Sequence, residues 1–334
     1  MMQQDPVGSL GLPAADRPIF VFAQHRGGGT LMLRLLNCHP ELVIWGEHGG
    51  FINHLAEADL VLRSYGALLG PRPEDEFARF LASDAAGLAD YAPWLSPLTV
   101  EDFPTWCRNM IRELFTRRLR PDQRWGFKEI RYHRPLVANF LARLFPGGQF
   151  ILLTRDPIEL CVSNILIYWG LQSLLARQVQ HDLVEVIQIV EDCLYAIVAM
   201  QTNMAAIRQA LPTRTVSVTY DELTATAATQ IERVLTFLRL APTPEVREKL
   251  RIVIGAVVGA TDKQRPASQP DQNLGLLTAD LLRGLATGLL PRVTEGITSH
   301  GIDLARLRRL SVHGRYSYLL GDLESIERGC SAIF

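Results

Sequence analysis

Residues 19–36 decide the fold, and they read IFVFAQHRGGGTLMLRLL. The first five are apolar, as in a parallel strand that is covered on both faces. Five of the last six are leucine or methionine, which predicts a buried helix. Three glycines, Gly27, Gly28 and Gly29, separate the two segments. A strand, a glycine loop and a buried helix in this order predict the start of a nucleotide-binding α/β domain.

The alternation of strand and helix continues along the chain. Short apolar runs predict strands at residues 42–45, 124–128, 149–154 and 215–219. Helical patterns follow at residues 135–145, from 157 onward, at about 182–210 and at 225–239. Asp156-Pro157 marks one helix start, because aspartate is a typical N-cap residue and proline fits the first helical position. This interleaving predicts an α/β fold of three layers, with a parallel sheet and a P-loop-type nucleotide-binding core.

Two further segments have helical patterns and no clear strand. Residues 51–120 contain helical patterns interrupted by proline and aspartate, which predicts a helical insertion that caps a site. Residues 241–334 predict a C-terminal helical region with a polar break at 261–273. Residues 1–16 are expected to be a flexible N-terminal tail, and residues 17–334 a single domain.

The composition is that of an ordinary globular protein. Of the 334 residues, 48% are hydrophobic and 21% are charged, which excludes a disordered or fibrous chain. The net charge is −1, so no nucleic-acid partner is expected and any anion site must be local. The five cysteines have neither disulfide-framework nor zinc spacing. With no signal peptide and no apolar run of about 18 residues, we expect a cytoplasmic protein without a membrane span.

The glycine loop predicts an anion site. Because Gly27–Gly29 have no Cβ atoms, their backbone N–H groups can turn toward a ligand, and the following helix adds its positive N-terminal end. Arg26 supplies a positive charge and Thr30 a hydroxyl donor. An isolated glycine run is more often a flexible turn, but this one lies between a core strand and a buried helix. No lysine follows the glycines, so the loop is not a Walker A sequence and favours a single phosphate.

A second anion site is predicted where the strand at 149–154 ends. Arg155 follows that strand directly, at the edge where open α/β sheets bind ligands. Ser163 lies in the second turn of the next helix and can face the same side. The alternative is a surface pair between Arg155 and Asp156, with the serine facing solvent. Two such pockets, one at each strand end, suit a ligand with two separated phosphate groups.

At these motifs the chain resembles the sulfotransferases that use 3′-phosphoadenosine 5′-phosphosulfate (PAPS). Residues 25–31 are similar to their 5′-phosphosulfate loop, and Arg155 with Ser163 to their 3′-phosphate motif. Residues 218–223 and 237–240 resemble two later segments of that family. We expect Tyr220 to pack on the adenine and Lys263 to close over the 3′-phosphate. The expected cofactor-binding residues are Arg26, Gly27, Gly28, Gly29, Thr30, Leu31, Arg155, Ser163, Tyr220 and Lys263.

The resemblance implies a reaction. A sulfotransferase moves the sulfuryl group from PAPS to an acceptor hydroxyl and releases adenosine 3′,5′-bisphosphate. The implied acceptor is a small molecule, a carbohydrate or a peptide with a phenolic or tyrosyl group, and an oligomer is possible. Fixed cations can replace magnesium in this chemistry, and the sequence has no evident cluster of metal ligands, so no metal is expected.

Two residues are the expected catalytic groups. Glu47 follows the strand at 42–45 in a Gly-Glu pair like that of the carbohydrate and tyrosylprotein branches, where this glutamate resembles the catalytic base. Lys128 resembles the lysine of the family's Gly-x-Lys-Glu segment and would neutralise charge in the transition state. His48 is a second candidate for the base. The structural alternatives are an exposed loop glutamate and a surface pair of Lys128 with Glu129.

Two other functions stay open. A P-loop kinase-like phosphotransferase would need Lys-Ser/Thr after the glycines and an acidic metal ligand at a strand end, and neither is visible. A catalytically inactive, nucleotide-binding homologue is conceivable, because Gly27 and Gly29 stand where the family has hydroxyl residues. The presence of Glu47 and Lys128 argues against it.

Overall fold

Five parallel strands form the centre of the protein. A computed structural model describes residues 12–69, 100–168, 183–263 and 272–307. The strands follow the order β2-β3-β1-β4-β5. Each coincides with a predicted run or extends it by one residue at most: β1 (Ile19–Ala23), β2 (Leu42–Trp45), β3 (Arg124–Glu129), β4 (Gln149–Thr154) and β5 (Thr215–Thr219).

The strand order places β1 in the middle of the sheet. β1 pairs with β3 on one side, Val21 opposite Lys128, and with β4 on the other, Val21 opposite Ile151. The chain passes to β2 and β3 after β1 and then crosses to β4 and β5, so the connection changes direction at β1. In open α/β sheets ligands bind at such a switch point, outside the carboxyl ends of the strands. The glycine loop leaves the sheet at this point.

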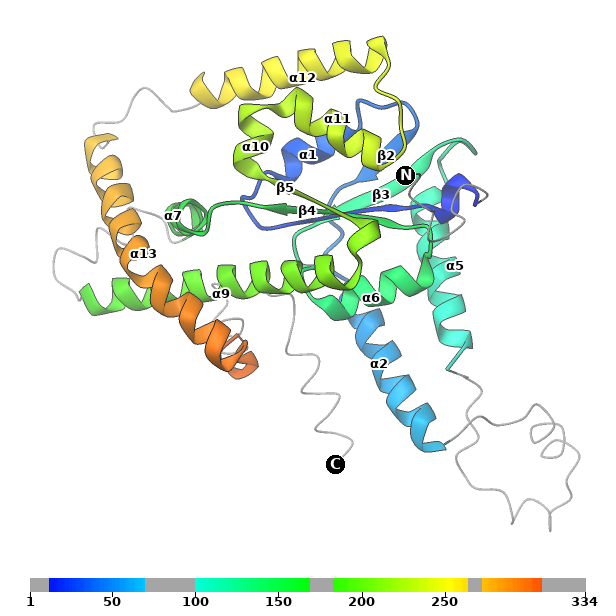
Figure 1. The fold of residues 1–334 in the computed structure, drawn as a ribbon, viewed down its shortest axis with the longest axis horizontal. Coiled ribbons are helices and arrows are strands. Elements are labelled where there is room, and N and C mark those ends of the chain that lie inside the picture. The colour runs from blue at the N-terminus through cyan, green and yellow to red at the C-terminus, as the bar shows by residue number, and fades with distance from the viewer. Residues whose placement is uncertain (1–11, 70–99, 169–182, 264–271, 308–334) are drawn as a thin grey trace, which may run out of the picture.

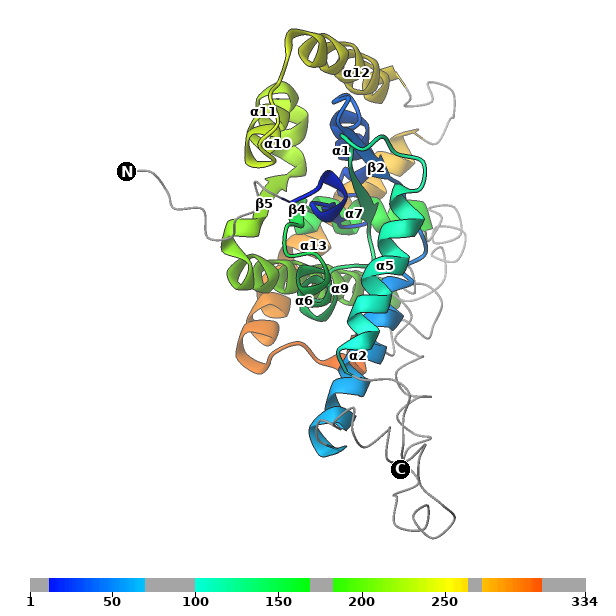
Figure 2. The same ribbon diagram turned by 90° about the vertical axis from the view of Figure 1, so that its right-hand side faces the viewer.

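Helices cover both faces of the sheet (Figures 1 and 2). One face carries α1 (Gly29–Leu36), α10 (Tyr220–Ala225), α11 (Ala227–Phe237) and α12 (Pro244–Lys263). The opposite face carries α2 (Ile52–Leu69), α5 (Asp102–Thr116), α6 (Pro135–Leu144) and α9 (Leu183–Ala210). At the carboxyl edge of the sheet, α7 (Pro157–Tyr168) and α13 (Gln272–His300) pack against α9. The three-layer α/β fold predicted from the sequence is confirmed.

The two faces of the sheet have different cores because successive side chains on a strand point to opposite sides. On the α1 face, Ile19 and Val21 of β1 pack with aliphatic side chains. On the other face, Phe20 and Phe22 enter an aromatic cluster in which Phe20 lies 5.1 Å from Phe127, centroid to centroid. A third cluster joins α7, α9 and α13. These buried layers pack against both faces of the sheet and against its carboxyl edge.

The structure differs from the sequence expectation after β5. The helix expected at residues 225–239 is present as α11 (Ala227–Phe237), but a further short helix, α10, precedes it and begins at Tyr220. A capping box explains this additional helix. The Thr219 hydroxyl accepts from the amide of Glu222, and the Glu222 carboxylate accepts from the amide of Thr219 at 2.9 Å. Tyr220 is therefore the first residue of a helix.

The described end of the expected N-terminal tail is packed on the domain. Ala14–Asp16 form a short 3₁₀ helix. The indole of Trp125 donates to the carbonyl of Ala15 at 2.7 Å, and Arg108 pairs with Asp16 at 2.9 Å. Because these partners lie on β3 and α5, the ordered contacts of the domain begin before residue 17.

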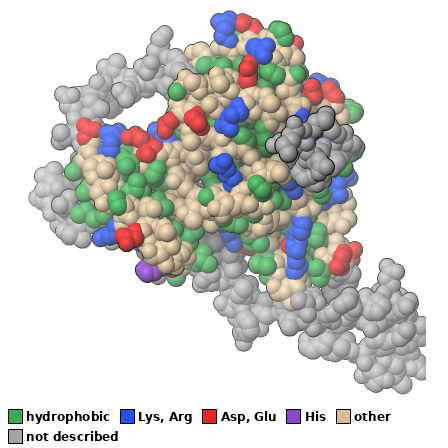
Figure 3. Space-filling view, viewed as in Figure 1, with side chains coloured by type: hydrophobic (Ala, Val, Ile, Leu, Met, Phe, Trp, Pro, Cys, Tyr) green, Lys and Arg blue, Asp and Glu red, His purple; other side chains and the backbone are tan. Residues whose placement is uncertain are grey.

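The surface carries both signs of charge. Figure 3 shows acidic and basic side chains interspersed over the face seen there, without a broad patch of one sign. Within the described segments, no helix is both long enough and apolar enough to cross a membrane.

Candidate active site

The glycine loop brings its backbone close to two other elements. Gly28 has a φ of 88°, in the left-handed region that favours glycine, and forms the N-cap of α1 without a side-chain hydrogen bond. A Cβ atom at Gly28 would lie 2.5 Å from Cδ2 of Tyr220, and one at Gly29 would lie 2.4 Å from Cε of Lys128. Both side chains therefore pack directly on the loop. The uncapped amides at the start of α1 are suited to hold an anion.

The residues around these glycines differ in what they offer a ligand. Arg26 and Thr30 are exposed, and Arg26 has a φ of 63°. The side chain of Leu31 is buried in the core, so only its backbone amide can contact a ligand. The amide of Gly27 donates to the carbonyl of Gln24 at 2.9 Å, so it is not available to a ligand.

Arg155 contacts both the glycine loop and Tyr220. Its guanidinium carbon is 4.5 Å from the centre of the Tyr220 ring, and its Nη1 donates to the carbonyl of Arg26 at 3.1 Å. Its Nε is buried without a hydrogen-bond partner in the described part of the chain. Asp156 caps α7 by accepting from the amide of Glu159 at 2.9 Å, so it is not the surface partner of Arg155. Ser163 is half-buried on α7.

Two glutamines that sequence reasoning missed hold Arg155 in place. The buried Oε1 of Gln24 accepts from the amide of Arg155 at 3.4 Å and from Nε2 of Gln201 at 3.2 Å. Gln201 also donates to the carbonyl of Arg155 at 2.7 Å. Because Gln201 lies on α9, far away in sequence, no local pattern pointed to it. Of the two glutamines, only Gln24 lies beside a motif that the sequence singles out, the glycine loop.

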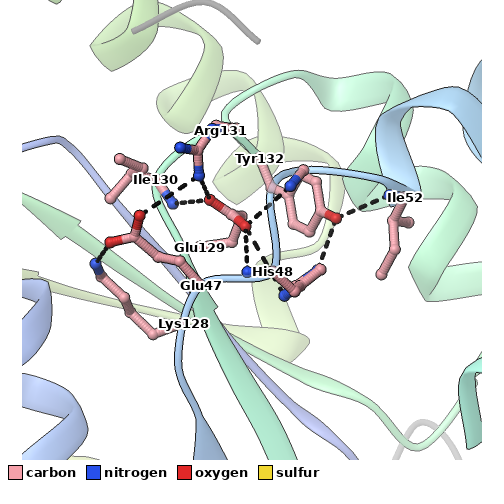
Figure 4. Close-up of polar contacts among 9 residues, drawn as sticks. Glu47, His48, Ile52, Lys128, Glu129, Ile130, Arg131 and Tyr132 are labelled. Atoms are coloured by element: carbon pink, nitrogen blue, oxygen red, sulfur yellow. Dashed lines mark hydrogen bonds and ion pairs between the residues drawn. The ribbon is translucent and has the colours of Figure 1, made fainter. Parts of the chain in front are cut away.

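The two expected catalytic residues are in contact (Figure 4). The ammonium of Lys128 donates to Oε1 of Glu47. The Lys128 side chain is 7% exposed, whereas the Glu47 side chain is 37% exposed and reaches solvent. Arg131 approaches the other carboxylate oxygen of Glu47 at 3.4 Å. Because the Lys128 stem covers Gly29, the glycine loop, Lys128 and Glu47 form one continuous line of contacts.

This environment keeps Glu47 ionised. Burial acts to raise the pKa of the Glu47 carboxyl, but the hydrogen bond and charge of Lys128, together with the charge of Arg131, outweigh it. The pKa of Glu47 therefore lies below its ordinary value. The carboxylate is ready to accept a proton, and its basicity depends on where the Lys128 ammonium points.

Glu129 does not pair with Lys128, contrary to the surface-pair alternative. The two are consecutive on β3 and point to opposite faces. Oε2 of the fully buried Glu129 accepts from the amides of His48 and Gly50, each at 3.1 Å. Its Oε1 accepts from the amide of Ile130 at 2.9 Å and from Arg131 at 2.7 Å. Glu129 therefore fixes the loop that presents Glu47. The sequence shows Glu129 beside Lys128, but it does not predict that Glu129 holds a loop so far away in the chain.

His48 is held on the side of this loop away from Lys128. Its Nε2 lies 2.8 Å from the Tyr132 hydroxyl, which also accepts from the amide of Ile52 at 2.9 Å. The contact with the Tyr132 hydroxyl holds Nε2 on the inner side of the loop. The ring packs against Phe127 with centroids 4.6 Å apart, and burial lowers the pKa of His48. With Nε2 occupied, His48 is poorly placed to take a proton from a substrate.

His25 links the segment that leads into the glycine loop to α7. Its Nδ1 lies 3.3 Å from Oδ1 of Asn164, the residue after Ser163 on α7. Burial lowers the pKa of His25, while the charge of Glu47 acts in the opposite direction. The glycine-loop motif includes this histidine, but its pattern predicts no role for it.

One expected site residue cannot be placed. Lys263 is the last residue of α12, and its side chain lies outside the described residues. As for metals, the described residues contain no group of three or more histidine, cysteine, aspartate or glutamate side chains arranged to hold an ion.

Comparison with solved structures finds sulfotransferases of low sequence identity. STF9 from Mycobacterium avium is 16% identical, with a TM-score of 0.47, covering 89% of this chain and 79% of that one. The sulfotransferase domain from the curacin biosynthetic pathway is 15% identical, with a TM-score of 0.42 and coverage of 81% and 98%. STF1 from Mycobacterium tuberculosis H37Rv is 16% identical, with a TM-score of 0.39 and coverage of 82% and 77%. No curated protein matches the sequence.

The family assignment comes from the sequence itself. The sequence model of the sulfotransferase family matches residues 18–245. This region includes the complete sheet, the glycine loop, Glu47, Lys128 and Arg155. The chain belongs to the sulfotransferase family.

Proposed function

We propose that this protein transfers the sulfuryl group of PAPS to an acceptor hydroxyl and releases adenosine 3′,5′-bisphosphate. The observation that carries the proposal is the contact between Lys128 and Glu47 beside the glycine loop. It combines a cation, a carboxylate and an anion-binding backbone at the carboxyl end of β1. Sulfuryl transfer needs these three elements: a binding site for the phosphate, a positive charge that stabilises the transition state, and a base that takes the proton of the acceptor.

The residues present suit a ligand with two phosphate groups. The uncapped start of α1, with Arg26 and Thr30 beside it, would hold the 5′ side. Arg155 and Ser163 would hold the 3′-phosphate. The buried Nε of Arg155 has no partner among the described residues, which supports this assignment because a buried donor costs free energy unless it is paired. Tyr220 would flank the adenine.

PAPS supplies an activated sulfuryl group, and the protein's own residues supply the proton acceptor and the charge. The Glu47 carboxylate accepts the proton of the acceptor hydroxyl. In the described state Lys128 binds Glu47 and lowers its pKa. If the Lys128 ammonium turns toward an anion in the glycine loop, Glu47 loses its strongest partner. Its pKa then rises, and it becomes a better base. Lys128 in turn stabilises the negative charge that develops on the leaving phosphate.

The acceptor classes follow the sequence expectation: a sugar, a small molecule, or a phenolic or tyrosyl group. A cytoplasmic location is part of the same proposal. Its support is that the four described cysteines are free and buried, which is typical of proteins in a reducing compartment. They are Cys38, Cys107, Cys161 and Cys193.

Ligand binding followed by turnover tests the proposed function. Thermal unfolding is measured with adenosine 3′,5′-bisphosphate and, separately, with ATP and magnesium. At about 100 times its Kd, a ligand stabilises the folded state by roughly 2.7 kcal/mol. We expect the bisphosphate to stabilise the protein by about this amount. We also expect labelled PAPS to transfer its sulfuryl group to a hydroxyl acceptor in the presence of EDTA.

Each alternative has its own outcome in these measurements. Stabilisation by ATP with magnesium, together with activity that EDTA abolishes, would support the kinase-like function. Stabilisation by the bisphosphate without transfer to any member of a hydroxyl-acceptor panel would indicate an inactive homologue. Either result overturns the proposed function.

A further inference from the structure

A pocket of about 360 Å³ opens beside Glu47, between the end of β2 and the C-terminal end of α5. Its volume is that of a small-molecule site. Besides Glu47, the pocket is lined by Gly46 and His48 and by apolar and basic side chains, namely Trp45, Leu114, Phe115, Arg117 and Arg118. Glu47 thus lines the pocket and also contacts Lys128, which covers Gly29 of the glycine loop.

One part of the pocket is an apolar wall in a fixed position. The indole Nε1 of Trp45 donates to the carbonyl of Phe115 at 3.0 Å, which satisfies its polar atom and holds the ring. Phe115 is stacked on Trp125, with ring centroids 5.3 Å apart and an angle of 3° between the planes. The neighbouring Leu114 is 59% exposed. An exposed leucine beside a rigid aromatic wall offers contact to a ligand with an apolar body.

The other part of the pocket is positively charged. Arg117 and Arg118 follow α5 directly and are exposed. Neither forms an ion pair with another described residue, although most other arginines near the site have carboxylate or carbonyl partners. Basic residues at the end of a helix also interact favourably with its dipole. The helix dipole does not explain why both arginines line a cavity that Glu47, the proposed base, also lines.

We propose that this pocket is the acceptor subsite and selects an acceptor that carries a second, negatively charged group. The acceptor's apolar body would lie on Trp45 and Leu114. Its hydroxyl would be placed at Glu47, and its carboxylate, sulfate or phosphate group at Arg117 and Arg118. This inference rests on the proposed function, because it is that function which requires an acceptor at Glu47.

The test uses two acceptors that differ only in charge. One is 3-(4-hydroxyphenyl)propanoate and the other is the corresponding neutral amide. Binding of each is measured by ligand-observed NMR in the presence of adenosine 3′,5′-bisphosphate, and turnover is measured with PAPS. For the wild-type protein we expect affinity and kcat/KM to favour the acid by roughly tenfold, as for charge-assisted contacts in a partly exposed site.

Substitution of the two arginines isolates the role of charge. The double variant Arg117→Gln/Arg118→Gln should lose the preference for the acid, so that kcat/KM for the acid falls to about that for the amide. Arg251→Gln is the matched control, since Arg251 is an exposed arginine on α12 whose ion-pair partner is Glu248 on the same helix. This control should keep the preference. A wild-type protein that binds the two compounds equally, or binds neither, overturns the proposal, and so does a double variant that still prefers the acid.

Failure of the proposed function would look different. In that case the acid would still bind better than the amide, and the two arginine substitutions would still remove this difference. No sulfur would be transferred from PAPS to either compound. The binding measurement therefore decides on the pocket, and the transfer measurement decides on the reaction.

Discussion

Replacing Glu129 by glutamine should destabilise the protein, although the two side chains have nearly the same shape. Each oxygen of this fully buried carboxylate accepts two hydrogen bonds. Oε2 binds the amides of His48 and Gly50, and Oε1 binds the amide of Ile130 and the guanidinium of Arg131. Glutamine has one oxygen and one NH2 group. In either orientation the NH2 group faces two donors, so two hydrogen bonds are lost and the Arg131 charge loses its buried partner.

The size of the effect follows from this loss. Removing one partner of a buried ion pair costs about 3–5 kcal/mol. Part of the cost is recovered because Arg131 can still contact Glu47, at 3.4 Å. We therefore expect the lower end of this range, which corresponds to a fall in Tm of roughly 5–10 °C. Differential scanning calorimetry of wild type and Glu129→Gln at pH 7 measures it. Glu248→Gln, on the exposed surface of α12, is the matched control and should leave Tm unchanged.

Glu129→Gln should also slow turnover well below its unfolding temperature, because the loop from residue 46 to 50 loses two of its anchors and no longer holds Glu47 beside Lys128. Affinity for adenosine 3′,5′-bisphosphate should stay near the wild-type value, since Glu129 does not contact the glycine loop. A Glu129→Gln protein that unfolds at the wild-type temperature with full kcat would refute the argument that this carboxylate positions the loop.

Three further results are expected. Gly28→Ala should weaken bisphosphate binding about tenfold in calorimetric titration, because its Cβ atom would strain the left-handed backbone and displace Tyr220. Arg155→Ala and Ser163→Ala should each weaken the same binding by about ten- to a hundredfold while the far-ultraviolet circular dichroism is unchanged. Stability should fall as pH decreases from 6.5 to 5, because burial lowers the pKa of His133 to about 4 and the unfolded chain takes up a proton that the folded chain does not. The contribution of His133 to this loss is about 2 kcal/mol in urea unfolding, and His133→Gln should remove that contribution.

Each of these expectations has a contrary outcome. Wild-type bisphosphate affinity in Gly28→Ala would mean that the loop accommodates a side chain without moving Tyr220. Unchanged affinity in both Arg155→Ala and Ser163→Ala would remove the 3′-phosphate pocket from the proposal. Equal stability at pH 6.5 and 5 in the wild-type protein would show that His133 accepts a proton in the folded state.

The sheet could be predicted well from the sequence because its signals are local. The apolar run from Ile19 to Ala23 is short, is followed within four residues by the glycine loop and is buried on both faces, so few other structures suit it. The start of α10 was missed although its signal is also local. Thr219 and Glu222 form a capping box three residues apart, but Tyr220 was assigned to the adenine site and not to a helix start.

The candidate site was only partly predictable. Glu47, Lys128 and Arg155 lie at the ends of predicted strands. Because the strands are parallel, the sequence places all three residues at the same edge of the sheet. The partners that hold them come from distant segments. Gln201 supports Arg155 from α9, and Glu129 holds a loop about 80 residues earlier in the chain. No spacing in the sequence encodes such contacts, because packing brings these segments together only after the sheet and its helices have formed.

The most direct test of the central claim is the turnover of Glu47→Gln with PAPS and a hydroxyl acceptor, measured together with its affinity for adenosine 3′,5′-bisphosphate. Glutamine keeps the shape of the side chain but cannot accept the proton. We expect kcat to fall by about 10²–10⁴-fold, the usual contribution of a general base, while the bisphosphate Kd stays near wild type. His48→Ala should reduce kcat far less. Near-full kcat in Glu47→Gln, together with a large loss in His48→Ala, would contradict the account and assign the base to His48.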